Sequence, residues 1–342
     1  MVIDFQDKAF KDFLPASAFE QKVKSFLKDF FADSETVNVQ TSGSTGTPKV
    51  FGIEKSRMLN SAKMTCDFLN LKAGDSALLC LPVEYISGKM MVVRSLERKL
   101  RLMVTDPSVK PVENLNNEID FCAMTPLQVE NSLYKIHLIR NLIIGGAAVA
   151  ESLKHKIKTQ LAKAAVDCRI FETYGMSETL SHIALKEIYP NSESYFTVFD
   201  NVEISTDERG CLQIFAPKLN PEKLQTNDLV ELRNEKEFRF LGRIDNVINS
   251  GGAKIFPEEL EALVKSKTDV ELVFVGISDE TLGQKLVLII EGVENHFVTQ
   301  KISTVNFEKS FHRPKEIIFV EKFPRTPNGK IDRRTLIQEL SL

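Results

Sequence analysis

The sequence lacks the marks of several large classes of protein. No apolar run approaches the roughly 18 residues that spanning a bilayer requires, so we expect no membrane span. The net charge of −3 provides no basic excess of the kind that nucleic-acid-binding domains show. The five cysteines are scattered without a CxxC pair, which is typical of reduced, mostly buried thiols. The first residues, MVIDFQDKAFKDF, are charged throughout and do not resemble a secretory signal, so we expect a cytoplasmic protein.

What is present is an ordinary globular composition in a chain of 342 residues, 43% hydrophobic and 27% charged, which is long enough for two or three domains. An amphipathic helix is predicted over 17–32 and another helix over 151–165. Short apolar runs predict strands over 76–83, 101–106, 119–125, 138–149 and 168–175. Strands that alternate with helices predict an α/β sheet, with ligands at the carboxyl ends of the strands.

The pattern changes beyond about residue 190. Two β-hairpins are predicted, one around 207–210 and one around 234–236. After them a compact α+β unit is predicted, whose first helix begins at Pro257. We therefore expect a large N-terminal α/β domain over 1–244, shortened at its N-terminus and carrying a β-hairpin segment. A small, mobile α+β domain is expected over 245–342.

The segment TSGSTGTPKV, residues 41–50, is rich in hydroxyl side chains and glycine and ends close to a lysine. Glycines let a bound group approach the backbone, and successive amide groups in such a turn form a concavity suited to oxyanions. The segment is therefore interpreted as a phosphate cradle, with a solvated Ser/Gly linker as the alternative. It does not match the P-loop, which needs four residues between its glycines and ends in Gly-Lys-Ser/Thr.

Five motifs occur in a fixed order: TSGSTGTPK, YGMSET, TNDL, GRIDNVINSGGAKIFPEELE and PRTPNGKID. Together they resemble the adenylate-forming superfamily of AMP-binding enzymes, which holds acyl-CoA synthetases, adenylation domains of peptide synthetases and luciferases. The resemblance covers roughly residues 41–334. It implies an AMP-forming acid–thiol ligase that uses ATP, Mg²⁺ and coenzyme A. A small-molecule carboxylate would be activated as an acyl-adenylate and then passed to the thiol, with no protein partner evident.

The resemblance also implies roles for individual residues. Lys330 would be the catalytic lysine that bridges the substrate carboxylate and the α-phosphate, where a reaction between two anions needs positive charge. Glu178 would be catalytic by holding Mg²⁺, a hard cation that prefers oxygen ligands. The residues that would bind ATP and AMP are Thr41, Ser42, Gly43, Ser44, Thr45, Gly46, Lys49, Gly145, Gly146, Ala147, Tyr174, Gly175, Ser177, Asp228 and Arg243. Asp245 would be the hinge, and Ser250, Gly251 and Gly252 would line the route of coenzyme A.

The chain departs from the family pattern at several points. Only forty residues precede Thr41, where typical members carry well over a hundred. The pair Glu84-Tyr85 stands where relatives have an aromatic residue and then histidine, Asn227 replaces a usual glycine, and Ser177 replaces a more common threonine.

Three further segments, LIIGGAAV, YGMSETLSHIALK and SGGAKIFPEELE, resemble those of the o-succinylbenzoate–CoA ligases of menaquinone biosynthesis. Ser181 and His182 follow the YGMSET motif and are expected to face the acyl pocket, where they would hold the ketone or the second carboxylate of such an acid. A buried structural histidine is the alternative. Two other functions stay open at this point: another aryl- or acyl-CoA ligase or carrier-protein adenylase, and a non-catalytic nucleotide- or acyl-sensing module.

Overall fold

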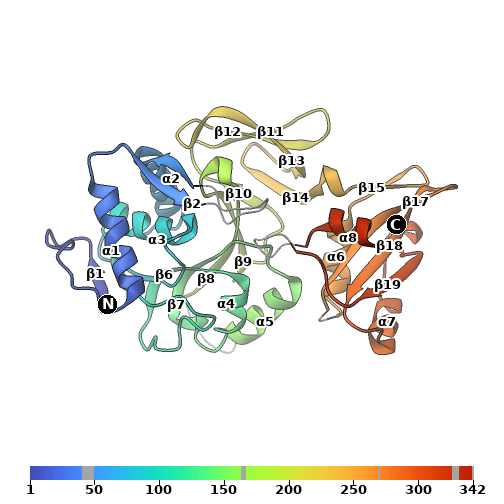
Figure 1. Ribbon diagram of the computed structural model, residues 1–342, viewed down its shortest axis with the longest axis horizontal. Helices are drawn as coiled ribbons and strands as arrows, with labels where there is room; N and C mark the ends of the chain where they lie inside the picture. Colours follow the sequence, from blue (N-terminus) through green and yellow to red (C-terminus); the bar gives the residue numbers. More distant parts are fainter. Residues whose placement is uncertain (41–49, 163–166, 269, 326–330, 341–342) are drawn as a thin grey trace.

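The computed structural model describes residues 1–40, 50–162, 167–268, 270–325 and 331–340. Within them a large mixed sheet and a smaller sheet lie side by side (Figure 1). The large sheet has the strand order β1-β5-β4-β6-β7-β8-β9-β10-β14-β13-β12-β11. Among these residues no helix combines the length and the apolar character that crossing a bilayer demands.

The middle of the large sheet is parallel. Its strands are β4 (Ser76–Leu79), β5 (Arg101–Val104), β6 (Ile119–Met124), β7 (Ile139–Ile144) and β8 (Arg169–Gly175). Each predicted strand is confirmed, although β4 and β7 end earlier than their apolar runs. The antiparallel edges are β1 (Val2–Asp4), β9 (His182–Tyr189), β10 (Phe196–Val198), β11 (Glu203–Thr206), β12 (Cys211–Ala216), β13 (Asn220–Leu232) and β14 (Glu237–Arg243). The hairpins β11–β12 and β13–β14 are both as predicted.

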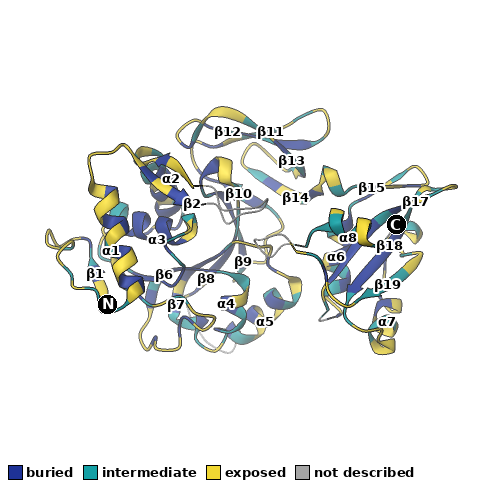
Figure 2. Ribbon diagram, viewed as in Figure 1, coloured by how far each residue is buried: buried dark blue, intermediate teal, exposed yellow. Residues whose placement is uncertain are grey.

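Helices cover both faces of the parallel strands. The helices are α1 (Ala18–Phe31), α2 (Lys55–Phe68), α3 (Ile86–Arg98), α4 (Pro126–Glu130) and α5 (Glu151–Leu161). Successive residues of β6 alternate between two cores, with Phe121 packing among α1–α3 and Cys122 packing with α4 and α5. This alternation follows from the two-residue period of a strand, and it explains why both faces of these strands are buried in Figure 2.

Helix α1 shows how local signals set an element. Ser17 caps the helix by accepting a hydrogen bond from the Glu20 backbone N–H at 3.2 Å. Its buried side chains recur at helical spacing and face the core: Phe19, Val23, Phe26, Leu27 and Phe30. The helix predicted over 17–32 is therefore confirmed. Helices α2 and α3, which carry residues of the site, are not evident in the sequence pattern.

The smaller sheet has its own cores. Its strands are β15 (Ile248–Ser250), β16 (Ala253–Ile255), β17 (Leu272–Asp279), β18 (Gly283–Glu291) and β19 (Glu316–Val320). Helices α6 (Pro257–Lys265) and α7 (His296–Ser303) contribute to the core on one face, and α8 (Arg333–Glu339) contributes on the other. The two-stranded sheet of β2 (Thr36–Gln40) and β3 (Val50–Glu54) flanks the undescribed segment 41–49.

Candidate active site

Two turns meet at one edge of the parallel sheet. Strands β7 and β8 are parallel neighbours with Ile144 opposite Glu172, so Gly145-Gly146, which follow β7, lie beside the end of β8, which runs through Thr173 to Gly175. A Cβ atom on Gly145 would lie 2.7 Å from Thr173 Oγ1, and one on Gly175 would clash with the backbone of Ser181 and His182. Gly146 has a φ of +87°. Glycine at these positions therefore gives a tight edge whose backbone a nucleotide can approach.

Three predicted nucleoside-binding residues come together beyond this edge. Tyr174 Oη donates a hydrogen bond to Asp228 Oδ2 at 2.6 Å, and Arg243 Nη1 lies 4.0 Å from Asp228 Oδ1. The Tyr174 ring stands edge-on to Phe238 at 4.8 Å between centroids. Burial, with the neighbouring Asp228 carboxylate, raises the pKa of Tyr174, so its hydroxyl remains a donor. The arrangement presents an aromatic ring next to a carboxylate, which suits a base and the hydroxyl groups of a ribose.

The predicted hinge residue joins the same cluster. Arg243 Nη2 donates to Asp245 Oδ2 at 2.9 Å, and Asn227 Nδ2 donates to both carboxylate oxygens of Asp245 at 3.3 and 3.2 Å. Asn227 Oδ1 in turn accepts from Arg209 Nη1 at 3.2 Å. The asparagine that departs from the family pattern therefore holds the Asp245 carboxylate, a contact that a glycine cannot make.

Ser177 and Glu178 lie in the short 3₁₀ turn Ser177–Thr179 that follows β8, and both are exposed. Leu180, directly after the turn, has a φ of +67°, a strained value for a bulky side chain. In the described parts of the chain no group of three or more His, Cys, Asp or Glu side chains encloses a metal site. A single exposed carboxylate fits Mg²⁺, which proteins usually hold through one or two carboxylates together with phosphate oxygens.

A buried cluster of charged side chains contacts the end of the glycine turn. Glu172 Oε1 accepts a hydrogen bond from the Val149 backbone N–H at 3.0 Å, and its Oε2 lies 2.9 Å from Lys186 Nζ and 3.5 Å from Lys154 Nζ. Burial alone would raise the pKa of the Glu172 carboxyl, but the two lysines hold it below its usual range. The charged carboxylate therefore ties the end of the Gly145–Val149 turn to β8 and β9.

Ser181 directly precedes β9, and His182 is the first residue of that strand and pairs with Gly175 of β8. His182 is buried, with Nε2 at 3.1 Å from Thr65 Oγ1 and Nδ1 at 3.4 Å from Ser181 Oγ. Burial, reinforced by the charge of Arg94, holds the pKa of His182 well below its usual range, so the ring is neutral. Both ring nitrogens thus have protein partners, and a direct contact of His182 with an acyl substrate stays a prediction.

Arg94 on α3 belongs to this cluster and is missing from the sequence-based set. Its Nη2 donates to Ser181 Oγ at 2.9 Å, the side chain is 2% exposed, and Nε has no hydrogen-bond partner within the described residues. None of the carboxylates described by the structure forms an ion pair with it. Burial lowers the pKa of Arg94 to about 10, so the guanidinium stays charged at neutral pH. A charged residue within the apolar run MMVVRSL is the signal that sequence reasoning overlooked.

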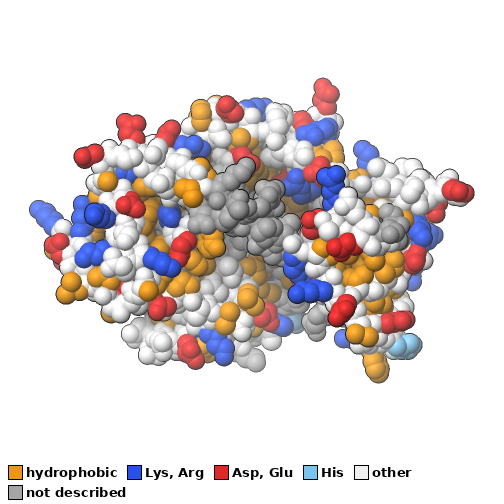
Figure 3. Space-filling model, in the orientation of Figure 1, with side chains coloured by type: hydrophobic (Ala, Val, Ile, Leu, Met, Phe, Trp, Pro, Cys, Tyr) orange, Lys and Arg blue, Asp and Glu red, His pale blue; other side chains and the backbone are white. Residues whose placement is uncertain are grey.

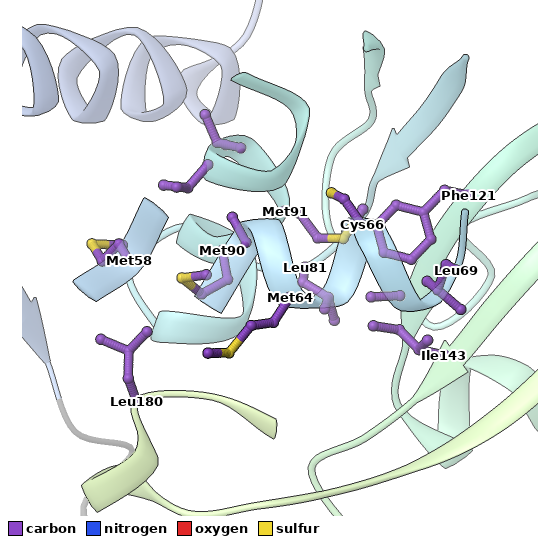
Figure 4. Packing of buried hydrophobic residues seen from close by; sticks show 14 of the residues in the cluster. Met58, Met64, Cys66, Leu69, Leu81, Met90, Met91, Phe121, Ile143 and Leu180 are labelled. Atoms are coloured by element: carbon purple, nitrogen blue, oxygen red, sulfur yellow. The ribbon is translucent and has the colours of Figure 1, made fainter. Parts of the chain in front are cut away.

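Apolar side chains of α2 and α3, the helix that carries Arg94, pack together in one cluster. Figure 4 shows Met58 and Met64 of α2 and Met90 and Met91 of α3 packed together, with Leu180 close by. Unbranched methionine side chains adapt to irregular shapes. A guanidinium without a carboxylate partner, on a helix whose buried hydrophobic side chains belong to an apolar cluster, suits a ligand that is largely hydrocarbon and carries an anionic group.

The loop 82–85, which holds the departure Glu84-Tyr85, is anchored by two lysines. Lys22 of α1 pairs with the Glu84 carboxylate, and buried Lys89 donates to the backbone carbonyls of Val83 and Glu84 at 2.5 and 3.2 Å. Tyr85 is 41% exposed. These contacts fix the loop against α1 and α3.

The predicted coenzyme A residues form a separate turn. Ser250, Gly251 and Gly252 connect β15 to β16, and both glycines have positive φ, +57° and +80°. A two-residue hairpin of this kind requires positive φ at both central positions. No hydrogen bond or ion pair between described residues joins this turn to Tyr174 or Asp228. In Figure 3 the surface is hollowed between the two parts of the molecule, and Lys and Arg side chains gather along the border on the side of the smaller sheet.

The remaining predicted residues lie outside the described residues. They are Lys330 and the segment containing Thr41, Ser42, Gly43, Ser44, Thr45, Gly46 and Lys49. Ala147, which is described, is exposed in the turn after β7.

Known proteins are similar to this chain over most of its length. A 2-succinylbenzoate–CoA ligase from Lactococcus lactis subsp. lactis (strain IL1403) is 27% identical over 341 residues, which cover 91% of this chain and 73% of that ligase. The crystal structure of an acyl-CoA synthetase (AMP-forming)/AMP-acid ligase II-like protein from Dyadobacter fermentans DSM 18053 is 33% identical with a TM-score of 0.64, and covers 95% of both chains.

The fold is also that of the O-succinylbenzoate coenzyme A synthetase from Bacillus subtilis, solved in complex with ATP and magnesium ion. The TM-score is 0.72 at 21% identity, over 87% of this chain and 69% of that chain. The family model described as AMP-binding enzyme matches residues 2–205. The match includes the glycine turn, Tyr174, Glu178, Ser181 and His182. The chain therefore belongs to the AMP-binding enzyme family.

Proposed function

We propose that the protein is an ATP-dependent ligase that joins coenzyme A to a carboxylic acid through an acyl-adenylate, and that the acid is o-succinylbenzoate. The observation that carries the choice of acid is Arg94. A charged group is costly to bury without a partner, so a buried guanidinium without a carboxylate indicates that the partner is a ligand. An acid with a second carboxylate supplies that partner, and the similarity to 2-succinylbenzoate–CoA ligases supports the same acid. The proposed pathway is menaquinone biosynthesis.

In this proposal the site holds the two reacting anions together. Tyr174 would stack on the adenine, while Asp228 accepts hydrogen bonds from the ribose hydroxyl groups and Arg243 orients that carboxylate. Glu178 would hold Mg²⁺, which neutralises phosphate charge. By family resemblance, the segment 41–49 and Lys330 would bind the phosphates and the developing charge at the reacting carboxylate.

We further propose that the chain is divided at 244/245, with Asp245 as the hinge and Ser250-Gly251-Gly252 on the coenzyme A route. Separate hydrophobic cores on either side of this point support the division. The five cysteines are all buried and free, which supports a reducing cytoplasmic location.

The test is a pyrophosphate-release assay with ATP, with and without coenzyme A, on three matched acids. They are o-succinylbenzoate, 4-oxo-4-phenylbutanoate, which lacks the ring carboxylate, and 2-butanoylbenzoate, which lacks the chain carboxylate. We expect o-succinylbenzoate to exceed the better of the two mono-acids in kcat/KM by at least about tenfold, because a mono-acid leaves the guanidinium unpaired. Equal activity on a mono-acid would contradict the choice of acid. Pyrophosphate release without thioester formation would instead favour a carrier-protein adenylase, and no release with any acid would favour a sensing module.

A further inference from the structure

A chain of hydrogen bonds runs from helix α2 to the buried arginine. Thr65 Oγ1 lies 3.1 Å from the Ser61 carbonyl oxygen and 3.1 Å from His182 Nε2. On the other side of the ring, His182 Nδ1 lies 3.4 Å from Ser181 Oγ, which accepts from Arg94 Nη2 at 2.9 Å. Thr65, on α2, is fully buried. The chain thus connects three elements, α2, β9 and α3, in one line of polar contacts.

One assignment of donors satisfies every contact along this chain at once. A carbonyl oxygen only accepts, so the single hydroxyl proton of Thr65 is given to Ser61, in the back-bond that threonine makes inside helices. Thr65 Oγ1 can then only accept from His182, which places the ring proton on Nε2. A neutral imidazole has one N–H, so Nδ1 is an acceptor and takes the hydroxyl proton of Ser181. Ser181 Oγ is left with lone pairs alone, which suit the Arg94 N–H.

We propose that Thr65 is the positioning residue that sets the specificity of the acyl site. It selects the Nε2–H form of His182, and through Ser181 it orients the Arg94 guanidinium so that its remaining N–H groups face an anionic substrate group. The proposal rests on the proposed function for the nature of that group, a second carboxylate. A threonine that served packing alone would be satisfied by Ser61 and would have no effect on the ring.

The burial and the neighbours of each group support the proposal. All four side chains are buried or half-buried, and Arg94 is the charged group that acts on the ring of His182. The histidine also stands edge-on to Phe199 at 5.5 Å between centroids, which fixes the plane of the ring. With the ring plane fixed, the position of one proton decides the contact with Ser181. If the proton is on Nε2, Nδ1 accepts from the Ser181 hydroxyl. If it is on Nδ1, that N–H competes with Arg94 for the Ser181 lone pairs.

The first test is the ¹⁵N spectrum of the histidine rings in the full-length protein, with His182 assigned by its loss in His182→Gln. We expect a neutral Nε2–H tautomer in the wild type and in Thr65→Ser, which keeps the hydroxyl. Thr65→Val has nearly the same shape without the acceptor, and there we expect a shift to Nδ1–H. An Nδ1–H ring in the wild type, or no change in Thr65→Val, would overturn the proposal. This readout requires no substrate, so it is independent of the acid that the enzyme uses.

The second test is kinetic. In Thr65→Val we expect KM for o-succinylbenzoate to rise about three- to tenfold with kcat nearly unchanged, which corresponds to one weakened hydrogen bond. Activity on whichever mono-acid is accepted should change less than twofold, and Thr65→Ser should restore the wild-type KM. Equal losses on both kinds of acid would show a general structural role and overturn the specificity claim. Denaturant unfolding of each variant checks that the fold is retained. If the expected tautomers are seen and o-succinylbenzoate is not used, the acid is wrong while the hydrogen-bond chain stands.

Discussion

Two arginines, the half-buried Arg333 and the buried Arg94, lie in different parts of the molecule and are held in opposite ways. Arg333 on α8 donates to Glu261 Oε2 at 2.7 Å and to the Phe274 carbonyl at 2.9 Å. Burial lowers the pKa of Arg333, but the attraction of Glu261 outweighs it and the pKa is raised. Arg94 donates to a neutral hydroxyl and its pKa falls to about 10. Arg333 has a carboxylate partner within the fold, and removing one member of such a pair is costly because the other charge stays buried. Arg94 has no carboxylate partner among the described residues, which is why we propose that a ligand supplies one.

We expect the largest effect for Arg333, the arginine with a carboxylate partner, and the quantity affected is stability. Arg333→Met leaves the Glu261 carboxylate buried and unpaired, so we expect the free energy of unfolding to fall by about 3–5 kcal/mol. Arg239→Met is the matched control, because its partner Glu231 is half exposed and such pairs contribute about 0–1 kcal/mol. Denaturant unfolding measures both. A loss below about 1 kcal/mol in Arg333→Met would remove the distinction between the two arginines.

Lys330 is expected to affect the reaction of every acid, and not the choice between acids. By resemblance it acts on the reacting carboxylate and the α-phosphate, which every acid shares. Lys330→Ala should therefore lower pyrophosphate release by roughly 10²–10³-fold for all accepted acids alike. ATP binding should be nearly unchanged. Wild-type rates in this variant would rule out the assigned role.

Arg94 should differ from Arg333 in its effect on stability and from Lys330 in its effect on the choice of acid. In Arg94→Met we expect kcat/KM for o-succinylbenzoate to fall by roughly 10²-fold, within the range of about 2–5 kcal/mol for losing one partner of a buried charge pair. The free energy of unfolding should stay constant or rise, because an unpaired buried charge is removed. Arg94→Lys keeps the charge without the planar fork and should recover part of the activity. A destabilised protein that treats all acids alike would place Arg94 with Arg333 as a structural residue.

The smallest expected effect is on the pH dependence of stability, and it comes from His182. His182 is neutral in the folded protein with its pKa held well below the usual value near 6.5, whereas the unfolded chain binds a proton there. Below about pH 6.5 the unfolded state takes up more protons, so stability falls as the pH falls, by up to about 1.4 kcal/mol per pH unit, until the depressed pKa is reached. His182→Gln should flatten this part of the curve. Parallel pH curves for wild type and variant would show that the histidine is not held neutral.

Much of the fold is visible in the sequence because its signals are local. The apolar spacing and the Ser17 cap predict α1, short turn segments predict the two hairpins, and Pro257 marks the start of α6. Helices α2 and α3 are harder to recognise, since both carry polar or charged residues on buried positions such as Thr65 and Arg94. Their helical form depends on packing against the sheet, and local pattern does not report it.

The order of the motifs is a property of the sequence, and it pointed to the family and to Tyr174, Asp228 and Arg243, which the fold brings together. The polar chain from Thr65 to Arg94, by contrast, depends on tertiary packing and could not be read from the sequence. Thr65 and Arg94 stand 117 and 87 residues from their partners His182 and Ser181, and a charged residue in a helix is ordinarily solvated. The burial of α3 removes water from the Arg94 guanidinium, and this loss of water is the physical basis for proposing that it binds a ligand.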